Sequence, residues 1–424
     1  MADVKISIIG AGSTYTPELM EGLLYKSRSL GLSEISFYDI DEERLDVLFE
    51  FCNRMSVAFN KPVRLTKHSD LKRAVDKSDF IVNQIRVGQQ RARIFDEKLG
   101  RSLGIIGQET TGVGGFSKAM RTIPIVLEQC RVYEKYAKNA FVINFTNPSG
   151  LITEAILRHT DMKCIGLCNI PMNLKMDIAN HFNVSPEKIE LDYIGLNHLG
   201  WVRSVKINGE VLKFDNIKKT TSDFSPKNIP DMDYPFDMLS ALNAFPGYYL
   251  RYFYLNREMV KKQRRSRFTR GEEVLKIEKR LLKIYSNKKI NTKPALLSKR
   301  GGAYYSKVAT SIIDSIINDK KDVHIVNVAS GGVVFGFGKD EVLEIPSVVS
   351  QKGAIPLKTG IEDHHMYSLM RMVKGYERLT IEAAVEKSYK KAILALMTNP
   401  LVMDATVAIK AVKMINKRFN LGLK

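Results

Sequence analysis

The chain has 424 residues, of which 44% are hydrophobic and 26% are charged, as expected for a globular protein with more than one domain. It contains no run of eighteen apolar residues and no basic, cleavable N-terminal signal, so we expect a cytoplasmic protein without a membrane span. Although the net charge is +19, Lys and Arg are interleaved with Asp and Glu, which favours a small anionic ligand over nucleic acid. Four cysteines are too few for a disulfide framework.

The first forty residues have the pattern of a dinucleotide-binding unit. A predicted strand at residues 4–9 is followed by a G-x-G-S turn and then by helical periodicity, the context in which a diphosphate binds at a helix N-terminus. A second apolar run ends at Asp39, where a carboxylate would bind the adenosine ribose and favour NAD over NADP. Tight turns use glycine anyway, and Tyr15 replaces the third glycine of the fingerprint. The pattern as a whole predicts an NAD site formed by Gly10, Gly12, Ser13 and Asp39.

Strands and helices alternate through the first 170 residues. Further strands are predicted at residues 79–85, 140–145 and 162–168, and helices at 116–138 and 151–159. This alternation is typical of a doubly wound parallel sheet. We therefore predict an α/β fold with a Rossmann-like N-terminal domain over residues 1–200 and a helix-rich α+β substrate domain over residues 201–424.

The polar segment between residues 86 and 115 is predicted to form part of a site. It ends in a glycine-rich stretch that contains Glu109, and such stretches are poor material for helices or strands. The alternative is a solvated, charged helix over residues 89–100, and we prefer this alternative for Arg91.

Cys168 and His198 form a pair of candidate metal ligands. Each lies at the end of a short apolar segment, and a sulfur and a nitrogen could hold a divalent metal if substrate oxygens completed the shell. Their separation of thirty residues matches no closed zinc motif, and a lone cysteine is often a buried packing residue. The residues alone leave both interpretations open.

The second half of the chain changes in pattern. We predict a hairpin at residues 203–213 that turns at Asn208-Gly209, a loop at 214–240, a tyrosine-rich segment at 245–255, a basic and then amphipathic helix at 261–285, strands at 323–330 and 343–350, and mostly helix over 362–413. Adjacent histidines diverge on a helix, so His364 and His365 are predicted to be surface or packing residues.

Eight short segments, taken in order, resemble one known family. They are GAGS, RVGQQRARIFDE, GQETTGVGG, NFTNPSG, CNIP, GLNH, YYLRY and TRGEEVLKIE. Together they are similar to the family 4 glycoside hydrolases, and specifically to the 6-phospho-β-glucosidase branch. The resemblance extends over residues 4–415, nearly the whole chain.

The resemblance implies a hydrolase that uses NAD⁺ and a divalent metal, usually manganese, in place of two catalytic carboxylates. In this family a hydride leaves C3 of the sugar, a tyrosinate removes the C2 proton, and the aglycone leaves C1 by elimination. Water then adds and C3 is reduced again, so that NAD⁺ is regenerated. The implied substrate is a phosphorylated disaccharide or aryl glucoside, and the implied assembly is a homodimer or homotetramer.

The matching positions also carry the family's residue roles. Cys168 and His198 would bind the metal, and Tyr249 would be the C2 base, made more basic by Glu109; Tyr248 is the alternative base. The phosphosugar would be bound by Arg93, Asn147, Asn169 and Arg270. Asn169 stands where the α-glucosidase branch has a proton-donating Asp, which favours β-glucosides.

Three other functions are also compatible with parts of the sequence. A 6-phospho-α-glucosidase or another family member would differ in glycoside specificity. An NAD-dependent 2-hydroxyacid dehydrogenase would share the N-terminal fold but would accumulate NADH. A non-enzymatic basic binding protein would account for the net charge of +19 without a catalytic site.

Overall fold

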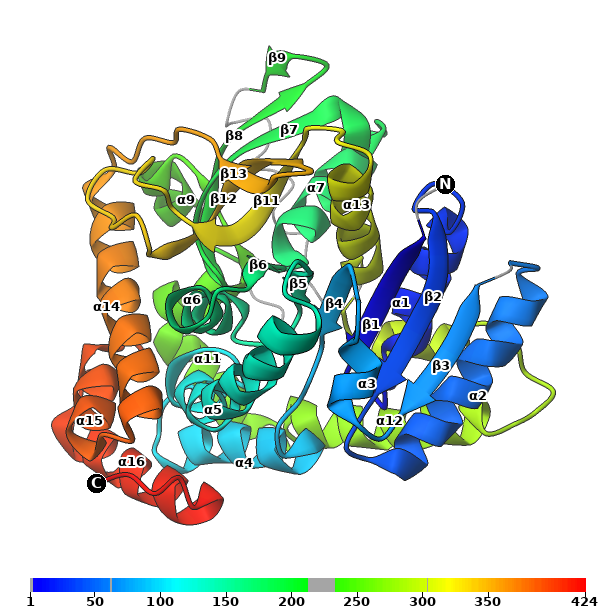
Figure 1. Cartoon of the computed structure of the whole chain (residues 1–424). Coiled ribbons are helices and arrows are strands. Elements are labelled where there is room, and N and C mark those ends of the chain that lie inside the picture. The colour runs from blue at the N-terminus through cyan, green and yellow to red at the C-terminus, as the bar shows by residue number, and fades with distance from the viewer. Residues whose placement is uncertain (1–2, 62, 213–232, 303) are drawn as a thin grey trace.

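The computed structural model describes residues 3–61, 63–212, 233–302 and 304–424. Its strands are β1 (Val4–Ile9), β2 (Leu32–Tyr38), β3 (Arg64–His68), β4 (Phe80–Asn83), β5 (Phe141–Asn144), β6 (Lys163–Gly166), β7 (Ile189–Leu196), β8 (Leu199–Ile207), β9 (Glu210–Val211), β10 (Phe245–Pro246), β11 (Asp322–Ala329), β12 (Val342–Ser350) and β13 (Gly353–Pro356). These strands all belong to one sheet (Figure 1).

The α-helices lie on both sides of this sheet and at one end of it. They are α1 (Thr16–Lys26), α2 (Glu42–Ala58), α3 (Leu71–Val75), α4 (Gln89–Ser102), α5 (Gly112–Tyr136), α6 (Ser149–His159), α7 (Ile170–His181), α9 (Phe236–Leu242), α10 (Arg251–Tyr254), α11 (Asn256–Arg265), α12 (Arg270–Tyr285), α13 (Tyr305–Ile317), α14 (His364–Glu386), α15 (Tyr389–Thr398) and α16 (Ala405–Phe419). Short 3₁₀ turns occur at Pro186–Lys188, Tyr248–Leu250 and Ala295–Lys299.

The N-terminal half of the sheet is parallel and has the Rossmann strand order. The order is β3-β2-β1-β4-β5-β6, and every neighbouring pair in it is parallel. The central strand β1 is buried on both faces, with Ile6 and Ile8 on one and Ser7 and Ile9 on the other, as a strand covered by helices on both sides requires. The predicted fold class is confirmed.

The rest of the sheet is antiparallel and continues from β6. Strand β11 pairs with β6, and β12, β7, β8 and β10 follow in that order. Strands from the C-terminal half therefore extend the N-terminal sheet, and β7 belongs to this antiparallel part although it precedes residue 200. The boundary at residue 200 stays a prediction. The hairpin at Asn208-Gly209 is present, with both residues at positive φ.

Two segments differ from their predicted structure. The first part of the predicted site loop between residues 86 and 115 is helix α4, close to the alternative helix at 89–100. One face of that helix is buried, and Asp96 accepts two hydrogen bonds from Arg121 of α5, at 3.0 and 2.6 Å. The predicted loop at 214–240 contains helix α9, which buries Leu239; residues 213–232 lie outside the described part of the chain.

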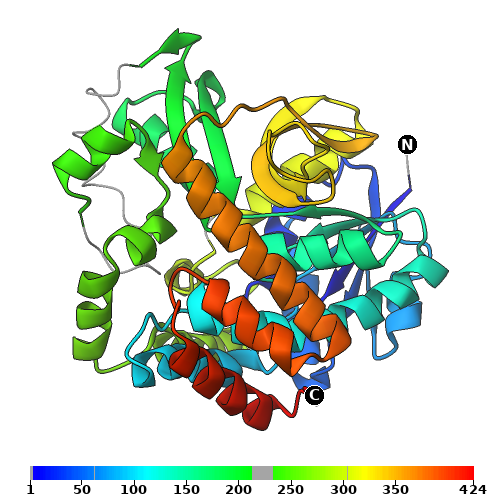
Figure 2. The ribbon, with the colours of Figure 1, turned by 90° about the vertical axis from the view of Figure 1, so that its left-hand side faces the viewer.

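The C-terminal helices pack against α5 and α6. Helix α14 crosses beside them, and α15 and α16 follow it along the same side of the molecule (Figure 2). At the centre of this contact the ammonium of Lys374 in α14 lies 2.8 Å from Glu154 of α6 and also pairs with Glu377. Lys374 and Glu154 are fully buried, so the helices are joined by an ion pair inside the core.

We expect Lys374→Met to destabilise the protein by about 3–5 kcal/mol, because two buried carboxylates lose the ammonium that they share and only Glu154 keeps a second cation, Arg378 at 3.7 Å. Denaturant unfolding measures this effect. The matched control is Lys391→Met: Lys391 also pairs with two carboxylates, Glu382 and Glu386, but at the surface, and its loss should leave the unfolding midpoint unchanged. Equal midpoints for the two variants would contradict the expectation.

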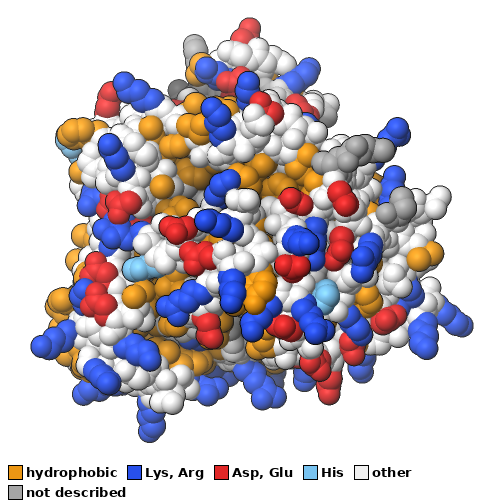
Figure 3. All heavy atoms as spheres, in the orientation of Figure 1, with side chains coloured by type: hydrophobic (Ala, Val, Ile, Leu, Met, Phe, Trp, Pro, Cys, Tyr) orange, Lys and Arg blue, Asp and Glu red, His pale blue; other side chains and the backbone are white. Residues whose placement is uncertain are grey.

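The surface shows no segregation of charge on the face viewed in Figure 3, where basic and acidic side chains are interspersed. This distribution agrees with the interleaving of Lys and Arg with Asp and Glu along the sequence. Among the described residues, no helix has both the length and the apolar character needed to cross a membrane.

Candidate active site

A cavity of about 330 Å³ opens where β1, β2, β4 and β5 end. Ten of the twelve predicted site residues line it: Gly10, Gly12, Ser13, Asp39, Arg93, Glu109, Asn147, Asn169, His198 and Tyr249. Other lining residues come from the C-terminal half, including Glu278, Arg300 and Tyr305. The cavity therefore lies at the carboxyl edge of the parallel sheet, where open α/β folds bind ligands, and it is closed by segments from the second half of the chain.

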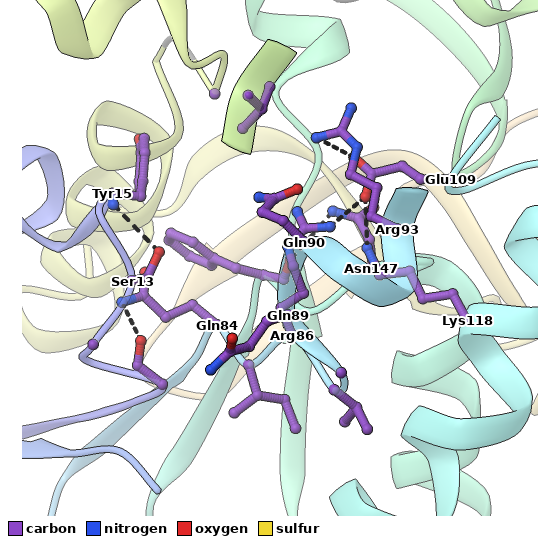
Figure 4. Close-up of a pocket in the computed structure, with 18 of the residues that line it drawn as sticks. Ser13, Tyr15, Gln84, Arg86, Gln89, Gln90, Arg93, Glu109, Lys118 and Asn147 are labelled. Carbon is purple, nitrogen blue, oxygen red and sulfur yellow. Dashed lines mark hydrogen bonds and ion pairs between the residues drawn. The ribbon is translucent and has the colours of Figure 1, made fainter. Parts of the chain in front are cut away.

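One end of the cavity is the glycine turn after β1 (Figure 4). Gly10 has a φ of +90°, and a Cβ there would lie 3.0 Å from the backbone of Gln84. At Gly12 a Cβ would lie 2.9 Å from Oδ2 of Asp39, which accepts a 2.8 Å hydrogen bond from the Gly12 amide. Both positions need glycine for close approach, and Asp39 is held against the turn at the edge of the cavity. This end fits the adenosine and diphosphate of a dinucleotide.

The other end holds a carboxylate among three cations. Glu109 accepts a hydrogen bond from Arg86 and lies 3.2 Å from Arg93 and 3.3 Å from Lys118 (Figure 4). Burial disfavours the ionised carboxylate, but Arg86, Arg93 and Lys118 together hold the pKa of Glu109 well below its usual range. Burial also lowers the pKa of Lys118 to about 7, against the opposing attraction of Glu109. Glu97 also pairs with Arg93, at 2.8 Å, so the wall has three basic side chains to two carboxylates, and this excess of basic groups suits an anionic substrate.

The two candidate bases point to different places. Tyr249 lines the cavity, and its ring stacks on the imidazole of His198 with centroids 3.8 Å apart. The neighbouring Tyr248 lies outside the cavity lining and donates a hydrogen bond to Asp177. The geometry thus favours Tyr249 over Tyr248 as the base.

The surroundings of Tyr249 make its phenol more basic. Burial raises the pKa of Tyr249 and the charge of Glu109 raises it further, while a hydrogen bond with Thr110 and the charge of Arg93 act in the opposite direction. Because the net shift is upward, the free phenol is protonated at neutral pH, and its ionisation requires further positive charge in the cavity.

His198 and Cys168 fit a metal site. Nδ1 of His198 is buried without a hydrogen-bond partner among the described residues, and burial lowers the pKa of this histidine to about 3, so the ring is in the neutral form that binds metals. Cys168 is 2% exposed, and burial raises the pKa of its thiol, so metal binding would release a proton. Cys168 does not line the cavity, but it belongs to the same buried hydrophobic cluster as Tyr249.

Arg270 is the predicted residue that the structure places elsewhere. Its guanidinium donates to the Lys299 carbonyl at 2.7 Å and to Glu273 at 3.1 Å, and it does not line the cavity. The sequence analysis missed Lys118, Glu278 and Arg300, which do line it. Lys118 lies inside a long helix and the other two are more than 260 residues from the glycine turn, so no local pattern distinguishes them.

Comparison with known proteins identifies the family. Residues 5–184 match the family described as family 4 glycosyl hydrolase, and residues 193–402 match its C-terminal domain. The chain is a family 4 glycosyl hydrolase. A probable 6-phospho-β-glucosidase of Bacillus subtilis is 37% identical over 415 residues, which cover 96% of this chain and 94% of that protein.

Solved structures of family members are closely similar. The 6-phospho-β-glucosidase of Thermotoga maritima with manganese, NAD⁺ and glucose-6-phosphate has a TM-score of 0.90 and 37% identity, and the match covers 98% of this chain and 99% of that one. A 6-phospho-α-glucosidase from gut microorganisms, with NAD and glucose-6-phosphate, has a TM-score of 0.89 and 27% identity, with 99% of each chain covered. The family predicted from the eight sequence segments is confirmed.

Proposed function

We propose that this family 4 glycosyl hydrolase cleaves 6-phospho-β-glucosides to glucose 6-phosphate and an aglycone, with NAD⁺ and Mn²⁺ as cofactors. The observation that carries the proposal is the stack of Tyr249 on His198 in a cavity that also contains the glycine turn and an electropositive wall. A base, a metal-binding nitrogen, a dinucleotide turn and a phosphate-binding wall are the parts that this chemistry needs. The identity to 6-phospho-β-glucosidases supports the same conclusion.

The residues of the chain have separable tasks in the proposed reaction. When bound, the dinucleotide supplies reversible hydride transfer at C3 and the metal supplies positive charge to the sugar oxygens. Cys168 and His198 would hold the metal, and the phenolate oxygen of Tyr249 would take the proton from C2. Arg93 and Asn147 would bind and orient the phosphosugar. Glu109 keeps the pKa of Tyr249 high, so that the phenolate, once formed, is a strong base.

Asn169 supports the choice of the β anomer. It lines the cavity next to Cys168 and at the start of α7. A carboxamide cannot donate a proton as an acid, so it gives no help to the departure of an α-linked alcohol. We therefore propose that Asn169 contacts the substrate without protonating the leaving group.

An activity panel tests the proposed function. We expect the chain to release p-nitrophenol from the β-glucoside 6-phosphate only when NAD⁺ and Mn²⁺ are both present, with slower release from the α anomer and from the galactoside. The absorbance of NADH should show no net rise, because each turnover returns the hydride. Full activity in EDTA without added cofactor would refute the proposal, and stoichiometric NADH would indicate a 2-hydroxyacid dehydrogenase.

We also propose that the chain works in the cytoplasm as a homodimer or homotetramer, as the family resemblance implies. Light scattering of the purified protein measures the assembly. A monomer at micromolar concentration would contradict this part of the proposal.

A further inference from the structure

Two arginines from distant parts of the chain reach the glycine turn. Nε of Arg300 donates to the Thr14 hydroxyl at 2.7 Å, and another nitrogen of the same guanidinium lies 3.3 Å from the Ser13 hydroxyl. Nε of Arg44, from α2, donates to the Gly12 carbonyl at 2.9 Å. Both arginines line the cavity.

A buried carboxylate holds the two guanidinium groups in place. Glu278 of α12 is 4% exposed and lies 3.3 Å from Arg300 and 3.7 Å from Arg44. Burial opposes its ionisation, but Arg300 and Arg44 keep the pKa of Glu278 below its usual value, so the carboxylate is charged at neutral pH. Asp39 is held against the same turn by the Gly12 amide, so the two guanidinium groups face two carboxylates there, and Glu278 is the one that pairs with both of them.

Tyr15, which replaces the third glycine of the fingerprint, brings Arg300 to this position. Its hydroxyl accepts a 3.1 Å hydrogen bond from the Ser306 amide, and its ring lies so close to Gly302 that a Cβ there would be 3.0 Å away. The Arg300 guanidinium is 5.8 Å from the centre of the same ring. Tyr15 therefore contacts residues on both sides of position 303, Gly302 and Ser306, and brings this part of the C-terminal half against the turn.

We propose that Arg300 and Arg44, positioned by Glu278, bind the diphosphate of the dinucleotide where it meets the glycine turn, and so clamp it there. The inference rests on the proposed function in taking NAD⁺ as the ligand. A glycine turn and a helix N-terminus bind a diphosphate with backbone amides, and a guanidinium held at the turn adds charge-assisted hydrogen bonds to it. Cofactor binding would thus join the C-terminal half of the chain to the Rossmann half. A glycine at position 15 has no side chain to make the contacts with Gly302 and Ser306.

Calorimetric titration of the full chain with NAD⁺, ADP and adenosine tests the clamp. We expect Arg300→Met to weaken the binding of NAD⁺ and ADP about 10- to 100-fold, the range for losing charge-assisted hydrogen bonds. The affinity for adenosine should be unchanged, because adenosine has no diphosphate. Arg300→Lys should recover part of the loss. The matched control is Lys293→Met: Lys293 also ties the C-terminal half to α1, 2.9 Å from Glu18, but lies outside the cavity lining and should not affect any of the three ligands.

Two outcomes would overturn the clamp: unchanged binding of NAD⁺ and ADP, or an equal loss of adenosine binding, which would show a general disruption of the turn. Failure of the wild-type chain to bind NAD⁺ would instead refute the proposed function, so the two failures are distinguishable.

Discussion

Tyr249→Phe will reduce turnover of the 6-phospho-β-glucoside at least about a thousandfold, within the range for loss of a general base. The phenol oxygen is the group proposed to take the C2 proton, and phenylalanine keeps the ring that stacks on His198. The fold and the NAD⁺ affinity should therefore remain as in the wild type. Steady-state kinetics measures the loss, and incorporation of solvent deuterium at C2 of the product should disappear with it.

The neighbouring tyrosine provides a matched control for this substitution. Tyr248→Phe removes a hydroxyl that donates to Asp177 outside the cavity lining, so it should lower thermal stability and keep most of the turnover. If Tyr248→Phe were the inactive variant, the base would be Tyr248 and the assignment from the cavity would be wrong.

Cys168→Ser should weaken Mn²⁺ binding at least about 100-fold and remove activity at low metal concentration, because even outer-shell changes cost 10–100-fold and this one removes a ligand. Serine preserves the shape of the side chain, but its hydroxyl does not ionise to replace a thiolate. Electron paramagnetic resonance of free Mn²⁺ measures the affinity directly, without reference to turnover. Excess metal should restore part of the activity if NAD⁺ binding is intact.

A second buried thiol in the same region provides the control. Cys164 lies in β6, four residues before Cys168, and its side chain is hydrogen-bonded with that of Thr153. Cys164→Ser should leave the Mn²⁺ affinity unchanged. Equal affinities in both variants would remove Cys168 from the metal site and leave it as a packing residue, the alternative that the residues alone had left open.

The sequence by itself determined the parts that depend on local pattern and order. The apolar strands, the G-x-G-S turn and their alternation with helices indicate the Rossmann half, since each element follows from the residues within it. Eight short segments in a fixed order indicate the family. The glycines of this turn can be recognised in the sequence because the fold requires them. A Cβ at Gly10 or Gly12 would lie about 3 Å from Gln84 or Asp39.

Only the tertiary structure decided which side chains meet. Tyr248 and Tyr249 are adjacent in sequence, yet one faces Asp177 and the other His198, because a 3₁₀ turn directs them apart. Arg270 matched a family segment but bonds to the Lys299 carbonyl, while Arg300, which no motif contains, reaches the glycine turn. Such contacts join residues between 29 and 286 positions apart, and they depend on packing between elements, which local pattern does not specify.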